Sequence, residues 1–292
     1  MQYMSMQTMG SLAFVAMLVM SMFAISVIAG DSQNMDVEFD IGNVAPVITG
    51  MAVAQASYDP TEASNTTVTV YFNLSDTNGV GDLDDAKAYI YVDDAATFAT
   101  AVGKYTRLCS PSANHSSTVR EYQCDTDLEF FDPAGTYSTN ITGGDQVVTV
   151  WNNTGTNAPT FTYTTLLAFN VSNTTIDFNS PSVGVANNSA ISNPTTLQNR
   201  GNADLYVNIT GADLTGASYT FGIGNFSVDL DADPTGEQVL TTSTEQINVS
   251  GTPAEMLKGA SSTEDLYFFV DVPVATQPDS YTGTWTLGIY EQ

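Results

Sequence analysis

Five carboxylate or amide side chains lie within ten residues of this chain, in the string DTNGVGDLDD. Carboxylate and amide oxygens on a glycine-bearing loop are ligands for a hard cation such as calcium, which takes about six to eight oxygens. The spacing is not that of an EF-hand, and Asp and Asn also cap ordinary turns with their side chains. The sequence therefore predicts either a calcium site or a solvated interstrand turn at Asp76, Asn78, Asp82, Asp84 and Asp85.

Two further acidic strings allow similar interpretations. The first is a second candidate for calcium and consists of Asp229, Asp231, Asp233 and Glu237. The second alternates along a predicted strand, which is typical of a solvated sheet face, and consists of Asp125, Asp127 and Glu129.

Few residues are available for catalysis by histidine or cysteine, because the chain holds one histidine, His115, and two cysteines. Cys109 and Cys124 enclose a polar insert and predict a disulfide in an oxidising compartment, with a reduced pair as the alternative. A zinc cluster of four Cys/His ligands is excluded, and no phosphate loop or nucleophile elbow is present. We therefore expect a protein that is not an enzyme and that has no cofactor beyond calcium and glycans.

The net charge of the chain also excludes one class of partner. The chain has 292 residues, and 32 acidic against 6 basic residues give a formal net charge of −26. Such a polyanion repels phosphate, so nucleic acid is excluded as a partner. The apolar fraction of 42% is enough for a packed core, which separates this chain from disordered acidic tails.

Sites for N-glycosylation are unusually frequent. The 21 asparagines and the Ser/Thr content predict roughly five Asn-x-Ser/Thr sequons by chance, and the chain has eleven. They predict a glycosylated, secreted surface, although a Thr- and Asn-rich β protein also makes sequons incidentally. The sequons begin at Asn65, Asn73, Asn114, Asn140, Asn152, Asn170, Asn173, Asn187, Asn208, Asn225 and Asn248.

The elements that must hold these residues are mostly strands. Short β-branched and aromatic runs, separated by turn residues, are typical of β-sandwiches. They occupy residues 36–41, 46–48, 66–74, 88–92, 146–151, 205–209, 266–272 and 282–290. Helical periodicity is weak and confined to residues 94–102 and 253–258. A polar, proline-broken stretch at residues 176–195 predicts a boundary, giving β domains at 31–180 and 181–292.

Residues 1–30 contain no charged side chain, and residues 11–29 are nineteen mostly apolar residues. This length suits a membrane-spanning helix or a cleaved signal peptide. A signal peptide normally has a basic n-region, which is absent here. We therefore predict a hydrophobic N-terminal α-helix at 1–30, either retained in the mature protein or cleaved as a signal.

Several segments resemble modules of prokaryotic surface proteins. Residues 44–54, 66–92 and 132–145 are similar to Ig-like or cadherin-like modules, and residues 193–216 and 279–291 to a β module of secreted archaeal proteins. With the apolar N-terminus, the chain resembles archaeal type IV pilins and archaellins. That resemblance implies a mainly β fold, with a hydrophobic helix followed by two Ig-like β-sandwiches.

The function that follows is a structural subunit of an extracellular cell-surface filament, pilus- or archaellum-like, serving adhesion or motility. Its partners would be copies of itself, and the membrane during assembly. Two alternatives remain open. After cleavage near residue 30, the strand at 36–41 could complete a neighbour's sheet by donor-strand exchange. The chain could also be a secreted module that binds calcium or carbohydrate.

Overall fold

The computed structural model describes residues 35–94, 104–152 and 158–292. It is mainly β, with 47% of residues in strands and 2% helical. The only helical elements in these ranges are the short 3-10 turns η1 (Asp85–Lys87) and η2 (Ile223–Asn225). The predicted fold class, mainly β with a hydrophobic α-helix followed by two Ig-like sandwiches, is therefore wrong in its helix, since no α-helix is found among the described residues. The segment 1–30 itself lies outside the described residues.

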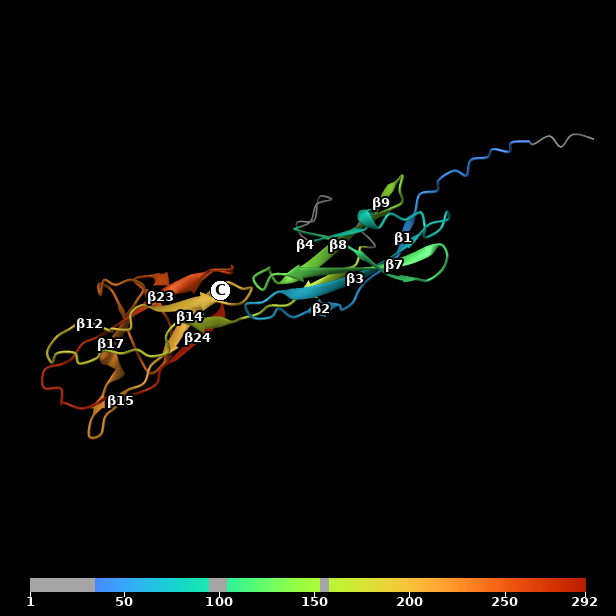
Figure 1. Ribbon diagram of the computed structural model, residues 1–292. Helices are drawn as coiled ribbons and strands as arrows, with labels where there is room; N and C mark the ends of the chain where they lie inside the picture. The colour runs from blue at the N-terminus through green and yellow to red at the C-terminus, as the bar shows by residue number, and fades with distance from the viewer. Residues whose placement is uncertain (1–34, 95–103, 153–157) are drawn as a thin grey trace, which may run out of the picture. The chain divides into compact units, whose positions relative to one another are not determined.

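The chain divides into two units, residues 1–42 and residues 43–292. The first half of the larger unit consists of two sheets (Figure 1). One sheet has the order β1 (Val47–Val53), β3 (Thr66–Ser75), β7 (Val119–Leu128), β6 (Ser110–Asn114). The other has the order β2 (Ser57–Tyr58), β10 (Thr160–Tyr163), β8 (Gly135–Gly144), β4 (Tyr89–Asp94), β5 (Tyr105–Leu108), with β9 (Thr149–Asn152) paired to β8. Strand pairing is antiparallel, except between β2 and β10.

Period-two patterning explains why these two sheets enclose one core. In β3 every second residue is buried, and Phe72 stacks on Tyr122 of β7 at 5.2 Å between ring centroids. The second sheet contributes Ile90 from β4 and Ile141 from β8 to the same cluster. Side chains that alternate across a strand thus place one apolar face of each sheet inward.

The second half of the unit is built in the same way from shorter strands (Figure 1). One sheet has the order β11 (Phe169–Val171), β13 (Thr195–Asn199), β23 (Thr263–Val270), β17 (Phe226–Asp229), β18 (Gln238–Val239), with β12 (Asn188–Ser189) paired to β23. The other has the order β19 (Thr244–Gln246), β14 (Leu205–Thr210), β22 (Glu255–Met256), with β24 (Thr286–Glu291) paired to β14. Two hairpins pair β15 (Leu214–Thr215) with β16 (Thr220–Phe221) and β20 (Asn248–Val249) with β21 (Thr252–Pro253).

The backbone that joins the two halves is held by the side-chain amide of Asn202. Asn202 Nδ2 donates to the carbonyl of Thr164 at 2.8 Å, and Asn202 Oδ1 accepts from the amide of Leu166 at 2.7 Å. The sheets change partners between Tyr163 and Phe169, which is earlier than the boundary at 176–195 suggested by composition.

Two smaller expectations also change. The predicted strand at residues 36–41 pairs with no other strand in the part of the chain that the structure describes. The weak helix candidate at 253–258 is occupied by β21 and β22, and most of the other, 94–102, lies outside the described residues. At residues 253–258 the tertiary context outweighs the local pattern.

Candidate metal centre

Three carboxylates meet at one end of the first half. Asp76 follows β3, Asp82 lies in the loop between β3 and η1, and Asp145 follows β8. One oxygen of each lies within 4.8 Å of an oxygen of the other two. Asp76 and Asp145 have no exposed surface, whereas Asp82 is half-buried. No other group of three metal-ligating side chains is found in the described ranges.

The first loop is shaped by its own aspartate. Asp76 Oδ1 accepts from the amide of Asn78 at 2.7 Å, and the Gly79 amide donates to the Asp76 carbonyl at 3.1 Å. Gly79 has φ = +107°, a conformation that glycine adopts without a Cβ clash. The Asp82 amide then donates to the Gly79 carbonyl at 3.1 Å. This succession of turns brings Asp82 back to Asp76.

The second loop is shaped in the same manner. Asp145 Oδ1 accepts from the amides of Val147 and Val148 at 2.7 and 2.5 Å. Asp145 Oδ2 accepts from Asn43 Nδ2 at 2.9 Å. Burial raises the pKa of Asp145, but these hydrogen bonds and the nearby charge of Lys87 outweigh it and lower the pKa overall. Asp145 therefore carries its negative charge in the folded state.

The cluster is rich in uncompensated negative charge. Asp76 Oδ2 is buried and has no hydrogen-bond partner. Lys87 is the nearby cation, and its Nζ donates to the backbone carbonyl of Asp145 at 2.5 Å. At an effective dielectric constant of 20, two ionised carboxylates about 5 Å apart repel by about 3 kcal/mol. A divalent cation among the three would replace this repulsion with attraction, and carboxylate oxygens are the ligands that calcium prefers.

Two of the residues predicted from the sequence point elsewhere. Asp84 caps η1 by accepting from the amide of Ala86 at 3.0 Å. Asp85 Oδ1 accepts from Arg120 Nη1 at 2.9 Å and from the hydroxyl of Tyr122 at 2.6 Å. Both carboxylates are already engaged outside the Asp76–Asp82–Asp145 cluster.

The sequence did not predict Asp145 as a candidate ligand. Its place is set by an isolated β-bridge between Leu83 and Asp145, and by the Asp84 amide donating to the Gly144 carbonyl at 2.9 Å. The only local signal was an aspartate directly after a strand that ends in two glycines, which is also typical of a plain turn. Long-range pairing, which one sequence does not reveal, makes it a neighbour of Asp76.

The other acidic strings do not gather in this way. In the second half, Asp231 Oδ1 accepts from the amide of Asp233 at 2.7 Å, and Asp233 accepts from the hydroxyl of Thr235. Asp229 is buried with its Oδ2 unpartnered, and burial raises its pKa. Glu237 is the last member of that string, and it adds to the charge around Asp229.

On β7 the acidic side chains lie on the exposed face. Asp125 and Asp127 accept from the hydroxyls of Thr69 and Thr67, both at 2.6 Å. Glu129 follows the strand and is half-exposed.

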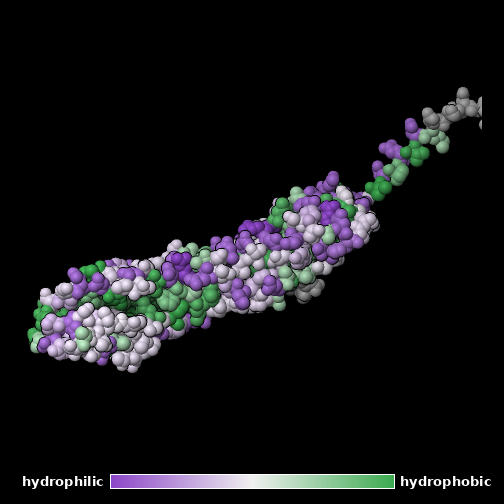
Figure 2. All heavy atoms as spheres, turned by 60° about the horizontal axis from the view of Figure 1, so that its bottom comes forward, coloured by the Kyte–Doolittle hydropathy of each residue, from purple (hydrophilic) through white to green (hydrophobic). Residues whose placement is uncertain are grey.

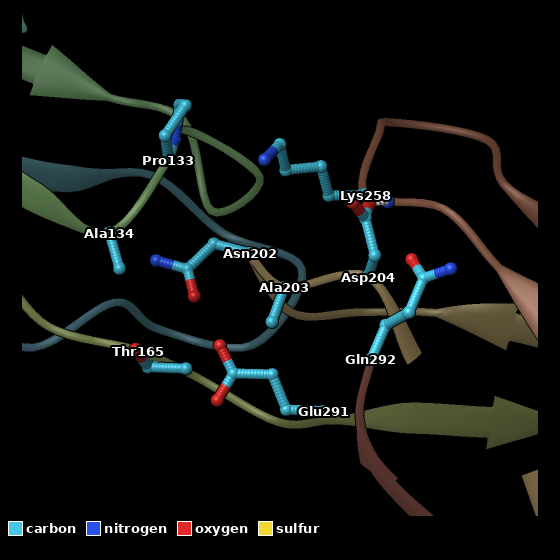
Figure 3. A pocket seen from close by; sticks show the side chains of 9 residues that line it. All are labelled: Pro133, Ala134, Thr165, Asn202, Ala203, Asp204, Lys258, Glu291 and Gln292. Atoms are coloured by element: carbon cyan, nitrogen blue, oxygen red, sulfur yellow. Dashed lines mark hydrogen bonds between the residues drawn. The ribbon is translucent and has the colours of Figure 1, made fainter. Parts of the chain in front are cut away.

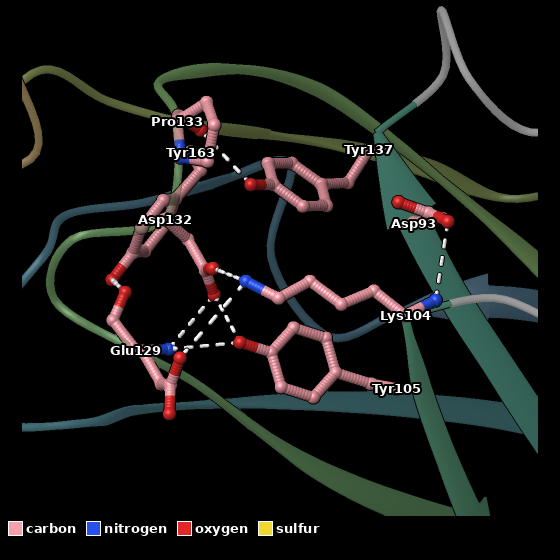
Figure 4. A network of polar contacts seen from close by, with 8 residues as sticks. All are labelled: Asp93, Lys104, Tyr105, Glu129, Asp132, Pro133, Tyr137 and Tyr163. Carbon is pink, nitrogen blue, oxygen red and sulfur yellow. Dashed lines mark hydrogen bonds and ion pairs between the residues drawn. The ribbon is translucent and has the colours of Figure 1, made fainter. Parts of the chain in front are cut away.

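A polar network beside Glu129 holds the turn between β7 and β8 (Figure 4). Asp132 has no exposed surface and accepts from the Lys104 ammonium, the Tyr105 hydroxyl and the Glu129 amide. Burial, followed by the Asp132 carboxylate, raises the pKa of Tyr105. Tyr163 donates to the Glu129 carbonyl at 3.2 Å, which fixes the same turn. All these contacts tie the β7–β8 turn to its neighbours.

A surface depression lies where the two halves of residues 43–292 meet (Figure 3). Its charged lining comprises Asp204, Lys258 and Glu291. Lys258 is engaged through its backbone amide, which donates to Asp204 Oδ1 at 2.6 Å. The Thr165 hydroxyl and the Lys258 ammonium also line it, but neither side chain forms a hydrogen bond or ion pair with Asp204 or Glu291 among the described contacts.

The two cysteines lie in the first half and connect its two sheets. Cys109 and Cys124 form a disulfide with 4.3 Å between their Cα atoms. Cys109 lies where the chain passes from β5 in one sheet to β6 in the other, and Cys124 lies on β7. The bond therefore fastens the crossing between sheets, and a loop of this length adds about 3 kcal/mol in the chain-entropy model.

The eleven sequons differ in their accessibility. Asn140 is buried in β8, so the folded chain does not present it for glycosylation. Half-buried asparagines are Asn73, Asn152, Asn173, Asn208 and Asn225. Exposed asparagines are Asn65, Asn114, Asn170, Asn187 and Asn248.

No protein-family model matches the sequence, and no curated protein matches it. Among the described residues, no helix has the length and apolar character needed to cross a membrane.

Proposed function

We propose that this chain is a structural subunit of a pilus- or archaellum-like extracellular filament on the surface of a prokaryotic, archaeal-type cell. The observation that carries the proposal is a disulfide-bonded β-rich unit in the same chain as thirty uncharged, largely apolar residues. A disulfide persists in an oxidising compartment. An uncharged apolar segment needs a dry environment, which packing among copies of the chain supplies.

The surface suits such a role. Five sequon asparagines are exposed, and sugars there would hydrate a protein with only six basic residues. Partners would be further copies of the chain, with the membrane involved during assembly. Adhesion or motility would follow from the assembled filament.

The test compares the full chain with a variant lacking residues 1–30. We expect filaments of the full chain in electron micrographs, and a soluble monomer with β-type circular dichroism from the truncated variant. Mass spectrometry of material from the native source would establish whether residues 1–30 remain. Monomeric full chain under all conditions, including calcium and high salt, would contradict the proposal.

A specific observation favours a second route to the same filament. Met35, Val37, Phe39 and Ile41 alternate with acidic residues, and 76–84% of the surface of each is exposed. Figure 2 shows this alternation of apolar and polar residues along the segment. Such a strand can complete an open sheet edge of another copy. Filaments formed by the truncated variant, and lost on Val37→Asp with Phe39→Asp, would identify this route.

A further inference from the structure

The chain enters the larger unit through a segment that contacts both loops of the carboxylate cluster. Asn43 Nδ2 donates to Asp145 Oδ2 at 2.9 Å. The next amide, that of Val44, donates to Asn78 Oδ1 at 2.8 Å. Asn43 and Val44 are exposed, and the first buried residue after them is Pro46. These two hydrogen bonds can form together only while the two loops stay close to each other.

A buried, unsatisfied oxygen points to a ligand between those loops. Asp76 has no exposed surface, and its Oδ2 has no hydrogen-bond partner. Buried polar atoms are nearly always paired with protein, water or an ion, because an unpaired one is costly. The same carboxylate is one of the three whose oxygens lie within 4.8 Å of one another. The unpaired atom therefore belongs to a carboxylate of the cluster.

We propose that Asp76, Asp82 and Asp145 bind one hard divalent cation of the calcium class, and that this cation fastens the entry segment, residues 43–46, to the first half of the unit. Three carboxylates supply up to six oxygens, and water or backbone carbonyls complete a coordination number of about six to eight. Asp82, which is half-buried, gives the ion a path from solvent.

The fastening follows from electrostatics. Without the cation, repulsion among the carboxylates opposes the close approach of the two loops and weakens the hydrogen bonds that Asn43 and Val44 make to them. With the cation, both loops are held on one ion and both hydrogen bonds form. Because coupling is reciprocal, holding the entry segment also tightens the site.

Calorimetric titration tests the site directly. Calcium is added to the full chain, to Asp82→Asn and to Asp145→Asn, up to about 10 mM, an order of magnitude above the dissociation constants typical of extracellular modules. Ionic strength is kept constant so that screening does not contribute. We expect both substitutions to weaken binding at least about tenfold, since each removes one of three charged ligands.

The matched control is Asp84→Asn, which changes an acid two residues from Asp82 that caps η1 instead. It should bind calcium as the unmodified chain does. Asp82→Asn is the decisive variant, because Asp82 is half-buried and its replacement leaves the turn hydrogen bonds of Asp76 and Asp145 intact. Absence of calcium binding by the unmodified chain, or binding unchanged in Asp82→Asn, would overturn the site.

Hydrogen–deuterium exchange tests the fastening. We expect calcium to slow exchange of the Val44 amide about tenfold in the unmodified chain and in Asp84→Asn, and to leave it unchanged in Asp82→Asn. Asn43→Ala should weaken calcium binding about threefold by reciprocity. Exchange at Val44 that is indifferent to calcium, together with unchanged affinity in Asn43→Ala, would overturn the fastening. Neither measurement depends on whether the chain forms filaments.

Discussion

The loop after β3 and the loop after β17 begin alike and end differently. Each starts at a buried aspartate, Asp76 or Asp229, whose Oδ2 has no hydrogen-bond partner, and each continues through further acids. Around Asp76 a second loop brings in Asp145, and three carboxylates converge. Around Asp229 the following acids cap turns in their own loop. Acid density in the sequence therefore does not reveal whether the carboxylates of a loop converge, because convergence depends on a second loop.

The two loops also relieve their charge differently. Hydrogen bonds outweigh burial at Asp145 and lower its pKa, which keeps a carboxylate ready for a cation. Burial dominates at Asp229, and the neighbouring charges of Asp231 and Glu237 raise its pKa further. Protonation is thus the natural relief at Asp229, and a bound cation the natural relief at Asp145.

The largest effect expected is that of calcium on the unmodified chain. A ligand present at about 100 times its dissociation constant stabilises the folded state by about 2.7 kcal/mol. For a unit of this size that corresponds to a rise in Tm of about 5–10 °C. Calorimetric scans in calcium and in chelator, at equal ionic strength, measure it. An identical Tm in calcium and in chelator would mean that the loop after β3, like the loop after β17, is a solvated turn.

Asp82→Ala should come next in size. In calcium it loses a ligand, and we expect a loss of about 2 kcal/mol in the free energy of unfolding. In chelator it removes one of three repelling charges, so we expect a slight gain, about 0.5 kcal/mol. Thermal unfolding in the two conditions gives both numbers. A loss of equal size in both conditions would mean that Asp82 acts through packing and not through a cation.

Asp229→Asn should stabilise the second half by about 1 kcal/mol at pH 7. The raised pKa of Asp229 means that its ionised form disfavours the folded state, and that this cost disappears as pH falls through the raised value toward 3.8. The gain from Asp229→Asn should therefore vanish in acid. The pH dependence expected for Asp145 has the opposite sign. Because its pKa is lowered, its ionised carboxylate stabilises the folded state above pH 3.8, and this stability is lost as pH falls through the lowered pKa. Tm measured against pH in chelator for both Asn variants checks the two signs, and a gain from Asp229→Asn that persists in acid would contradict them.

The smallest effect expected is that of Asp231→Ala. Its carboxylate caps a local turn on the surface, and such substitutions change stability by less than about 0.5 kcal/mol. We expect no difference between calcium and chelator. Loss of calcium binding in this variant would move the cation site to the second half and reverse the comparison.

Local patterns predicted several strands well. The predicted runs at 66–74 and 205–209 fall within β3 and β14, because alternation of apolar and polar residues over a long stretch has few alternative solutions. The run at 36–41 has the same alternation but finds no partner strand among the described residues. A strand needs a neighbour, and the availability of a neighbour is not a local property.

The sequence by itself determined the acidic surface, the β-rich character of the described chain, and the presence of Asp76 and Asp82 in one glycine-bearing loop, because composition and period-two patterning act over a few residues. Only the tertiary structure decided that Asp84 and Asp85 turn toward η1 and Arg120, and that Asp145 completes the cluster. The physical reason is that a cation site requires charges to converge in space. Convergence here depends on pairing between segments about sixty residues apart, whose register is fixed by the shared core and by turn hydrogen bonds rather than by either segment alone.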